Sequence, residues 1–459
     1  MRVVRNRGVL AERVPASPVL VEAYEAAVGA VHPARVLPRL LRGRGRCFEA
    51  AGAGPICGPV YVAGFGKASR SMAEALLGAI GDMVEAGVVI APRGMGGRVG
   101  PVEVLEGDHP APGRASLEAS LRLLDFLRGL PRGAALVVLV SGGGSALFEV
   151  PADGVELEDV AETTRLLMNA GADIYELNAV RKHLSAVKGG QLLRYTEARP
   201  VLGLYMSDVP GDRLDTVASG PTVPDPSTYR DAYEALRLHR VWERAPRRVR
   251  ERILAGLRGE APETPKPGDP VFQGVANRLV ARNRDALEAA AGALRARGRR
   301  VLVLTDTLRG EAREAGRVLA SILESLRHGP LAGRGYAALA AGGETTVTVR
   351  GRGRGGRSQE LCLSLAVSLS RLRVLGEGYA ALCAGSDGVD GNSPVAGAVV
   401  DAATLPRARA MGLDPLTFLA ENDSYGFFSR LGQVVDTGGY TGVNVNDVFL
   451  AVLGDAGSG

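Results

Sequence analysis

Short apolar runs alternate with stretches of helical periodicity along most of the chain. In the first half the apolar runs occupy residues 60–63, 88–91, 102–105, 135–140 and 201–206. Residues 67–80 and 116–127, which lie between them, have the spacing of helices. This alternation is typical of βαβ units, in which helices cover both faces of a parallel sheet. Residues 157–195 carry no strand signal, so we expect a helical region that caps the sheet or projects from it.

The alternation is interrupted at residues 259–270, a segment that holds four prolines and two glycines. Such a segment is typical of a linker or an exposed boundary loop. Beyond it, helices are predicted at residues 283–297, 311–326 and 358–372, and strands at 301–304, 337–341 and 380–384. The sequence therefore predicts an α/β protein of two domains, residues 1–270 and residues 271–459.

Composition places the chain among soluble globular proteins. Hydrophobic residues make up 46% of the 459 positions and charged residues 23%. No apolar run reaches 18 residues, so no membrane span is expected. The net charge is +5, but the basic residues are spread along the chain and aromatic residues are only 5%. These features disfavour a nucleic-acid partner and are compatible with an anionic small substrate.

The cysteines and the start of the chain predict a cytoplasmic location. The four cysteines form no CxxC pair and are too few for a disulfide framework. The first residues are charged and lack the apolar core of a signal peptide. The first 16 or so residues belong to no pattern, and we expect either a disordered extension or a misassigned start.

Lysine is rare, with four lysines among the 55 basic residues. Each lysine is therefore a candidate for chemistry that a guanidinium cannot perform. Lys67 lies in the segment AGFGKAS, where Gly64 and Gly66 would let the backbone approach an anion at a helix start. A dinucleotide-binding fingerprint would need glycine at the position of Ser69. A Walker A loop would need serine or threonine at the position of Ala68. The alternative is a tight strand–helix turn with a solvated lysine.

A second glycine-rich loop follows the apolar run at residues 135–140. Its sequence SGGGS supplies several backbone N–H groups that suit a phosphate; the residues are Ser141, Gly142, Gly143, Gly144 and Ser145. The alternative is a flexible loop without a ligand.

A basic segment and an acidic segment come next. On a helix over residues 178–191, Arg181, Ser185 and Lys188 would share one face and could bind an anion, although a solvated basic face is the alternative. In the loop at residues 207–222, Asp208 and Asp212 could hold Mg²⁺, or Asp208 could act as a base on a hydroxyl. Turns and helix caps would explain some of the aspartates in this loop.

The last candidates lie in the second half. Glu344 ends a predicted strand, and Arg357 follows in a glycine–arginine loop whose guanidinium groups can bind phosphate or carboxylate oxygens. Asp387, Asn444 and Asp447 lie in segments rich in aspartate, asparagine and glycine, and supply oxygen ligands. Solvated loops and ordinary turn chemistry are the alternatives for these segments.

Together these segments resemble the glycerate 2-kinase family, whose C-terminal half is called the MOFRL domain. The matching segments are GFGKAS (64–69), EGDHPAP (106–112), SGGGSALF (141–148), NAVRKHLSAVKGGQL (178–192), SDVPGD (207–212) with SGPT (219–222), GGETTV (342–347) with GGRSQE (355–360), AGSDGVDG (384–391) and TGVNVND (441–447). The resemblance extends over about residues 17–453. Each motif alone is weak, but their joint order is highly specific.

The resemblance implies an ATP- and Mg²⁺-dependent kinase that phosphorylates the 2-hydroxyl of D-glycerate. It also implies a Rossmann-like N-terminal domain, a smaller α/β C-terminal domain and an active site in the cleft between them. By this resemblance, Lys67 and Arg357 become the leading catalytic pair. Two further assignments are hypotheses from the residue types: Asp208 is another catalytic candidate, and the nucleotide and its phosphates would contact Gly64, Gly66, Ser141, Gly142, Gly143, Gly144, Ser145, Asn444 and Asp447.

The remaining roles are hypotheses based on charge. Glycerate would contact Arg181, Lys188 and Glu344, and the metal would contact Asp208, Asp212 or Asp387. The sequence does not decide whether the protein forms a homodimer. Three other functions stay open: a hydroxypyruvate reductase, a kinase of another small hydroxy acid, and a binding protein without catalysis. The missing dinucleotide fingerprint disfavours the reductase.

Overall fold

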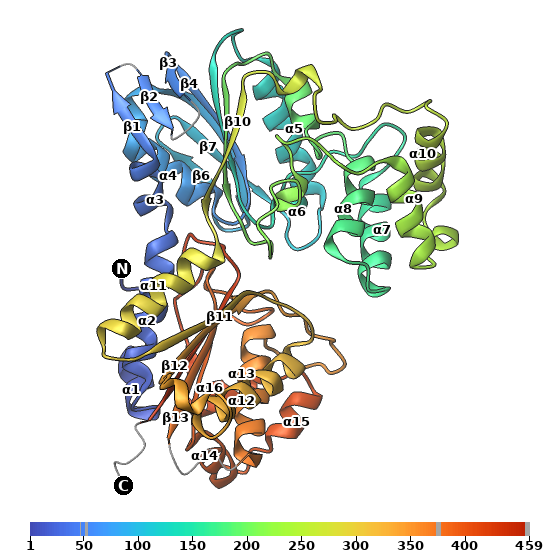
Figure 1. The fold of residues 1–459 in the computed structure, drawn as a ribbon. Helices are drawn as coiled ribbons and strands as arrows, with labels where there is room; N and C mark the ends of the chain where they lie inside the picture. Colours follow the sequence, from blue (N-terminus) through green and yellow to red (C-terminus); the bar gives the residue numbers. More distant parts are fainter. Residues whose placement is uncertain (46, 51–53, 373–377, 455–459) are drawn as a thin grey trace. The chain divides into compact units, whose positions relative to one another are not determined.

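The chain forms two compact units in the computed structural model, which describes residues 1–45, 47–50, 54–372 and 378–454 (Figure 1). The central unit consists of Pro33–Ala281. The terminal unit combines Met1–His32 with Arg282–Gly459. Residues 1–32 and 271–281 thus lie on the other side of the division from where the sequence pattern placed them.

A seven-stranded sheet forms the centre of the central unit. Its strand order is β10-β9-β8-β4-β5-β7-β6, and all neighbours are parallel except β6 and β7. The strands are β4 (Val60–Phe65), β5 (Val84–Pro92), β6 (Gly97–Val99), β7 (Val102–Gly107), β8 (Ala135–Val140), β9 (Val201–Met206) and β10 (Val275–Ala281). The five apolar runs predicted as strands are confirmed. Strand β10 escaped prediction because its half-buried sequence VANRLVA includes polar residues.

Helices α4 (Ser69–Ile80) and α5 (Arg114–Arg128) cover opposite faces of this sheet (Figure 1). Helix α3 (Pro33–Leu40) packs on α4 and leads into a small antiparallel sheet of β1 (Leu41–Arg44), β2 (Cys47–Ala50) and β3 (Gly54–Cys57). Cys47 and Cys57 face each other across β2 and β3 and form a disulfide. The sequence analysis expected no disulfide framework, and this single bond within a hairpin is a difference from it.

Four helices form a separate hydrophobic cluster beside the sheet: α7 (Leu157–Asn169), α8 (Ile174–His183), α9 (Tyr229–Leu238) and α10 (Arg247–Leu257). They include part of the predicted helical region, which projects from the sheet (Figure 1). Helix α8 ends at His183, however, and Ser185 and Lys188 follow it in non-helical backbone. The predicted helical face of Arg181, Ser185 and Lys188 is therefore wrong.

The terminal unit contains a six-stranded sheet in the order β11-β12-β16-β13-β14-β15. Its strands are β11 (Val301–Leu308), β12 (Ala338–Gly343), β13 (Tyr379–Gly385), β14 (Gly397–Asp401), β15 (Val434–Val435) and β16 (Asp447–Leu453). Only β11 and β12 are parallel. The sheet is mixed because the last strand, β16, runs antiparallel between β12 and β13.

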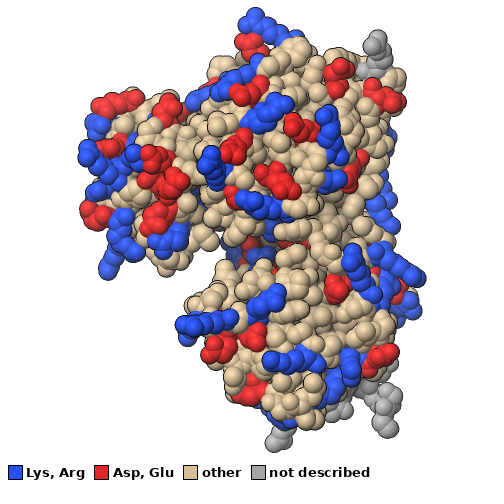
Figure 2. Space-filling model, turned by 180° about the vertical axis from the view of Figure 1, so that it is seen from behind, with Lys and Arg blue, Asp and Glu red and all other residues tan. Residues whose placement is uncertain are grey.

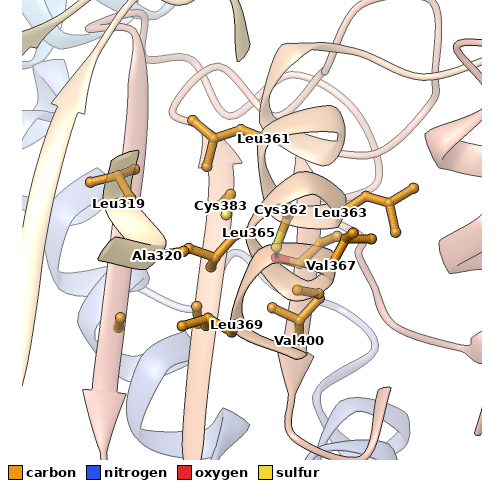
Figure 3. Close-up of a cluster of buried hydrophobic side chains, with 14 of the residues drawn as sticks. Leu319, Ala320, Leu361, Cys362, Leu363, Leu365, Val367, Leu369, Cys383 and Val400 are labelled. Carbon is orange, nitrogen blue, oxygen red and sulfur yellow. Dashed lines mark hydrogen bonds between the residues drawn. The ribbon is translucent and has the colours of Figure 1, made fainter. Parts of the chain in front are cut away.

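Helices cover both faces of the mixed sheet (Figure 1). On one face α2 (Ser17–Val31) packs beside α11 (Asn283–Ala296). The other face carries α12 (Ala312–Arg327), α13 (Arg357–Arg371), α14 (Thr404–Ala410), α15 (Pro415–Ala420) and α16 (Ser424–Leu431). Figure 3 shows the core beneath α13, where Leu361, Leu365 and Leu369 meet Cys383 and Val400.

The first residues are folded into the terminal unit. Helix α1 spans Arg7–Arg13 and buries Leu10 completely. The backbone N–H of Arg5 donates to the carbonyl of Asp436, and the side-chain amide of Asn6 donates to Val434, both at 2.8 Å. These contacts fix the segment to the edge of the sheet at β15, so the expectation of a disordered extension is wrong.

The charged side chains are intermixed on the face drawn in Figure 2, where acidic and basic groups alternate over each unit. This agrees with the even spread of basic residues along the sequence. Among the described residues, no helix combines the length and the apolar character required to cross a bilayer.

Candidate active site

Lys67 and the SGGGS loop lie side by side in the central unit. They follow β4 and β8, two adjacent parallel strands in which Phe65 is the register partner of Val140. From β4 the chain continues to β5 on one side, and from β8 it continues to β9 on the other. Such a reversal of strand order leaves a crevice at the carboxyl ends of the two strands, where α/β sheets bind ligands.

Close contacts hold the two loops together. The backbone N–H of Lys67 donates to the carbonyl of Gly142 at 2.9 Å, and that of Ala68 donates to Ser141 Oγ at 3.0 Å. Gly66 has a φ of +125°, and a Cβ there would lie 2.2 Å from Ser141 Oγ. Gly66 and Ser141 thus have a structural role in joining the loops.

The predicted phosphate loop keeps several donors for a ligand. In the described part of the chain, the backbone N–H groups of Gly142, Gly143 and Ser145 make no hydrogen bond. The hydroxyl of Ser145 lies 2.8 Å from that of Ser219, which in turn donates to Asn178. The SGPT segment thereby supports the loop from one side.

His109 lies on the other side of this loop and was missed as a site residue by the sequence analysis. Gly143 has a φ of +78°, and a Cβ there would lie 3.1 Å from His109 Nε2 and 3.2 Å from Lys67 Cγ. His109 is exposed and follows the end of β7, whereas Lys67 is half-buried. The available signal was the segment EGDHPAP (106–112), which contains His109 and belongs to the motifs that carry the family resemblance.

Lys188 is part of the core of the central unit. Its side chain is 1% exposed, and its ammonium group contacts Glu149 Oε2 at 2.5 Å and the carbonyl of Phe148 at 3.1 Å. Burial lowers the pKa of Lys188, while Glu149 opposes this effect. Lys182 is likewise buried against Asp225 at 3.0 Å. Burial also lowers the pKa of Arg181, to about 10. The geometry thus gives Lys182 and Lys188 buried carboxylate partners.

The acidic loop after β9 begins at the same edge of the sheet as the glycine loops. Asp208 and Asp212 are half-buried there. The third aspartate, Asp215, binds Arg213 at 2.8 Å and lies 3.9 Å from Lys182, so ion pairing explains it. His183 contacts Glu263 at 2.6 Å.

Arg357 is the centre of a second cluster, in the terminal unit. It is the first residue of α13, and its Nη1 lies 2.6 Å from Glu344 Oε1. Its Nε lies 2.6 Å from Asp447 Oδ2. Glu344 directly follows β12, and Asp447 begins β16 as the register partner of Gly343 and Gly385. Three neighbouring strands thus bring the cluster together at one end of the sheet.

The carboxylates hold the charge of Arg357 firmly. Burial alone would lower the pKa of the Arg357 guanidinium, but Asp447 and Glu344 raise it well above its usual value. Burial raises the pKa of Asp447, and Arg357 opposes this effect. Arg357 therefore remains a fixed cation at this site.

Asp387 joins the same cluster. A Cβ on Gly385 would lie 3.1 Å from Asp387 Oδ1 and 3.6 Å from Asp447 Oδ1, so the two carboxylates converge above this glycine. Asn283 supports Asp447 from below by donating to its carbonyl at 3.0 Å. Asn444, which we predicted to bind nucleotide, is buried in the segment before β16.

Asp390 fixes the start of the arginine-bearing helix. Its carboxylate accepts the backbone N–H groups of Ser358 and Gln359 at 3.0 and 2.9 Å. Burial and the charge of Asp447 raise the pKa of Asp390 to about 7, while these donors lower it. Its role as a cap could not be predicted from the sequence, because the helix that it caps is distant in sequence.

Family models match both halves of the chain. Residues 19–254 match a domain of unknown function (DUF4147), and residues 337–447 match the MOFRL family. A crystal structure of a glycerate kinase from Thermotoga maritima superimposes with a TM-score of 0.78 at 35% identity, covering 95% of this chain and 99% of that one. The mixed α/β fold is therefore that of a solved kinase.

Sequence relatives agree with the fold. A glycerate 2-kinase from Pyrococcus horikoshii is 39% identical over 87% of this chain and 88% of its own length. A relative from Agrobacterium vitis, which carries a provisional hydroxypyruvate reductase name, is 39% identical over 96% of this chain and 95% of its own. The fold and the loops define a small-molecule phosphotransferase. The chain belongs to the glycerate 2-kinase family.

Proposed function

We propose that this chain transfers the γ-phosphoryl group of ATP to the 2-hydroxyl of D-glycerate. The products are 2-phosphoglycerate and ADP, and the hydroxyl proton is released. The observation that carries the proposal is the junction of Lys67 with the SGGGS loop at the switch point of the parallel sheet. The name of the Pyrococcus horikoshii relative, glycerate 2-kinase, supports this proposal.

The glycine loop would hold phosphate oxygens. The N–H groups of Gly142, Gly143 and Ser145 can donate to an anion, and Lys67 adds a cation next to them. Phosphoryl transfer requires mainly positioning and charge stabilisation from the protein. We therefore assign phosphate binding to this loop and transition-state stabilisation to Lys67.

The terminal unit would supply the second cation. Arg357 is oriented by Asp447 and Glu344, so its position is fixed before a substrate binds. Preorganised charge of this kind lowers the barrier because no reorganisation is required during the reaction. We propose that the central unit is a Rossmann-like nucleotide domain, and that Lys67 and Arg357 act on the same phosphoryl group.

Mg²⁺ would fit the carboxylates above Gly385. Among the described residues no group of three or more His, Cys, Asp or Glu side chains forms a complete metal site. Magnesium in kinases, however, is usually held by one or two carboxylates together with substrate phosphates. Asp387 and Asp447 converge at the side-chain-free position of Gly385 and satisfy that requirement. The ion would neutralise phosphate charge, and Asp447 would keep Arg357 in place.

The acidic loop after β9 would bind glycerate and act on its 2-hydroxyl. We keep Asp208 as the candidate base for the 2-hydroxyl, with Asp212 nearby, because both lie at the same sheet edge as Lys67. For the glycerate carboxylate, the buried ion pair of Lys188 leaves Arg181 and the exposed His109 as candidates. Glu344 would accept a hydrogen bond from a glycerate hydroxyl.

The experiment that tests the function couples the product to enolase. The purified protein is incubated with D-glycerate, ATP and Mg²⁺, and enolase is added without phosphoglycerate mutase. Enolase consumes only the 2-phosphate, so a signal is expected that depends on all three components. ADP formation without an enolase signal would indicate a kinase that modifies a different hydroxyl or a different acid.

A reductase is the second candidate, because a relative carries that name. The loop after β4 has Ser69 where the third glycine of a dinucleotide fingerprint would stand. We therefore expect no oxidation of NADH or NADPH with hydroxypyruvate. Steady oxidation of either cofactor, together with no ADP formation from glycerate, would overturn the kinase proposal.

A further inference from the structure

Helix α2 contributes a buried phenol to the terminal unit. The helix falls largely within the first family model, at residues 19–254, yet it packs against β13 and β16, the strands that carry the Arg357 cluster. Tyr24 on this helix is fully buried. Its hydroxyl donates to the carbonyl of Gly385 at 2.7 Å. The N-terminal helix thereby reaches the last residue of β13.

The Gly385 carbonyl starts the turn that holds Asp387. The same carbonyl accepts the N–H of Gly388 at 3.4 Å, which closes the turn. Within the turn, Asp387 Oδ1 accepts the N–H of Val389 at 3.1 Å. The backbone carbonyl of Asp387 accepts the N–H of Thr441 at 2.9 Å. A shift of Gly385 would therefore move the Asp387 carboxylate relative to Asp447.

The phenol is suited to this task. Burial, followed by the nearby charges of Asp387 and Asp447, raises the pKa of Tyr24. The hydroxyl consequently stays protonated and serves as a constant donor to the carbonyl. A phenylalanine would fill the same space but would leave a buried carbonyl with only the long contact from Gly388, and such a loss is costly.

We propose that Tyr24 is a positioning residue for phosphoryl transfer, which fixes the Gly385 carbonyl and thereby the Asp387 carboxylate beside Asp447 and Arg357. The inference rests on the proposed function of that cluster. It assigns to the N-terminal helix a direct part in arranging the site at the end of the C-terminal sheet.

The test compares two substitutions of buried tyrosines on the enolase-coupled assay. Y24F deletes the hydroxyl at the site, and Y379F makes the same change at the opposite end of β13, where Tyr379 is 5% exposed. We expect Y24F to lower kcat by about tenfold with little change in KM for glycerate. We expect Y379F to stay within about twofold of wild type. A kcat for Y24F within twofold of wild type would overturn the proposal.

A double-mutant cycle separates positioning from packing. If Tyr24 acts through Asp387, Y24F should cause less than about a twofold change in the D387N background. The same tenfold loss in that background would contradict the proposed route. Mn²⁺ binding followed by electron paramagnetic resonance, without turnover, should weaken in Y24F and stay unchanged in Y379F.

Rescue by a donor distinguishes the hydroxyl from the shape of the ring. Replacement of Tyr24 by 4-aminophenylalanine retains an N–H donor and should restore most of the activity. If Y24F does not fold, this variant decides the matter, and a tenfold loss of kcat in it would count against the proposal. Full activity of Y24F with an inactive D387N would refute the role of Tyr24 and leave the role of Asp387 intact. Full activity of both would also refute the role assigned to Asp387.

Discussion

The Arg357 guanidinium binds Asp447 side-on, with Nε 2.6 Å from Oδ2 and Nη2 3.2 Å from Oδ1. The contact from Nη2 is a hydrogen bond, and the contact from Nε to Oδ2 is an ion pair. The third contact, from Nη1 to Glu344, leaves little rotational freedom. Asp447 therefore determines the direction in which Arg357 presents its charge.

Arg357→Lys keeps the positive charge but removes the planar double contact with Asp447. Because an ammonium group cannot make that contact, we expect kcat to fall by about 100-fold or more, with the fold retained. The measurement is the enolase-coupled rate at saturating substrates. Arg371→Lys, at the exposed end of the same helix, serves as the control. A rate within threefold of wild type for R357K would contradict the assigned role.

Lys67→Met tests the cation at the glycine loops. We expect kcat/KM to fall by about 100-fold or more, because charge on the transferred phosphoryl group loses its partner. The melting temperature should change little, since the half-buried side chain lies at a loop. Lys266→Met is a matched control, because Lys266 binds Glu263 and the carbonyl of Ser227 away from these loops. Equal losses in both variants would argue against a specific role of Lys67.

Lys188→Met tests the interpretation of Lys188 as a structural residue. Removal of the ammonium group leaves Glu149 buried without its partner, which typically costs about 3–5 kcal/mol. We expect a large drop in Tm. The double variant K188M/E149L should recover much of it, because an apolar pair of similar size can replace a buried ion pair. Loss of glycerate binding in a well-folded K188M protein would restore the substrate-binding role that the sequence suggested.

His109 offers a pair of isosteric substitutions. Gln can place its amide nitrogen where Nε2 lies beside Gly143, whereas Asn reproduces only the Nδ1 position. We expect H109N to raise KM for one of the two substrates about tenfold, which corresponds to the loss of one charge-assisted hydrogen bond. H109Q should retain most of the affinity. Equal behaviour of H109Q and H109N in steady-state kinetics would show that Nε2 makes no such contact.

Glu263 predicts how the helical cluster responds to acid. Burial raises the pKa of Glu263, but the hydrogen bond and charge of His183 have the larger, opposite effect. The net pKa of Glu263 is lowered to about 2. Because the folded pKa lies below the unfolded value near 4.5, this stabilisation is present above pH 4.5. It is lost as the pH falls towards 2.

Trp242 is the only tryptophan and contacts Tyr233 in the same cluster, so its fluorescence reports unfolding there. The urea midpoint of wild type should fall between pH 4.5 and 2. E263Q should start from a lower midpoint and change less over this range. Parallel curves for the two proteins would show that Glu263 does not carry the effect.

The sequence by itself determined the local elements and the chemistry of the loops. Apolar runs such as Ala135–Val140 require burial on both faces, and this local property predicts strands without knowledge of their partners. The loops that contain Lys67 and Arg357 were recognisable from a few consecutive residues. In each loop, glycines that allow the backbone to approach a ligand closely stand beside a cationic side chain. The order of the motifs along the chain was sufficient to identify the family.

The tertiary structure decided the features that depend on distant partners. It placed Tyr24 against Gly385, β16 between β12 and β13, and Lys188 in the core with Glu149. Helical periodicity could not reveal that α8 ends at His183. The residues that follow, such as Lys188, bind distant residues of the central unit, and the local sequence does not show those partners. Burial and ion pairing at these positions arise from contacts between segments that are far apart in sequence, and a local pattern contains no record of them.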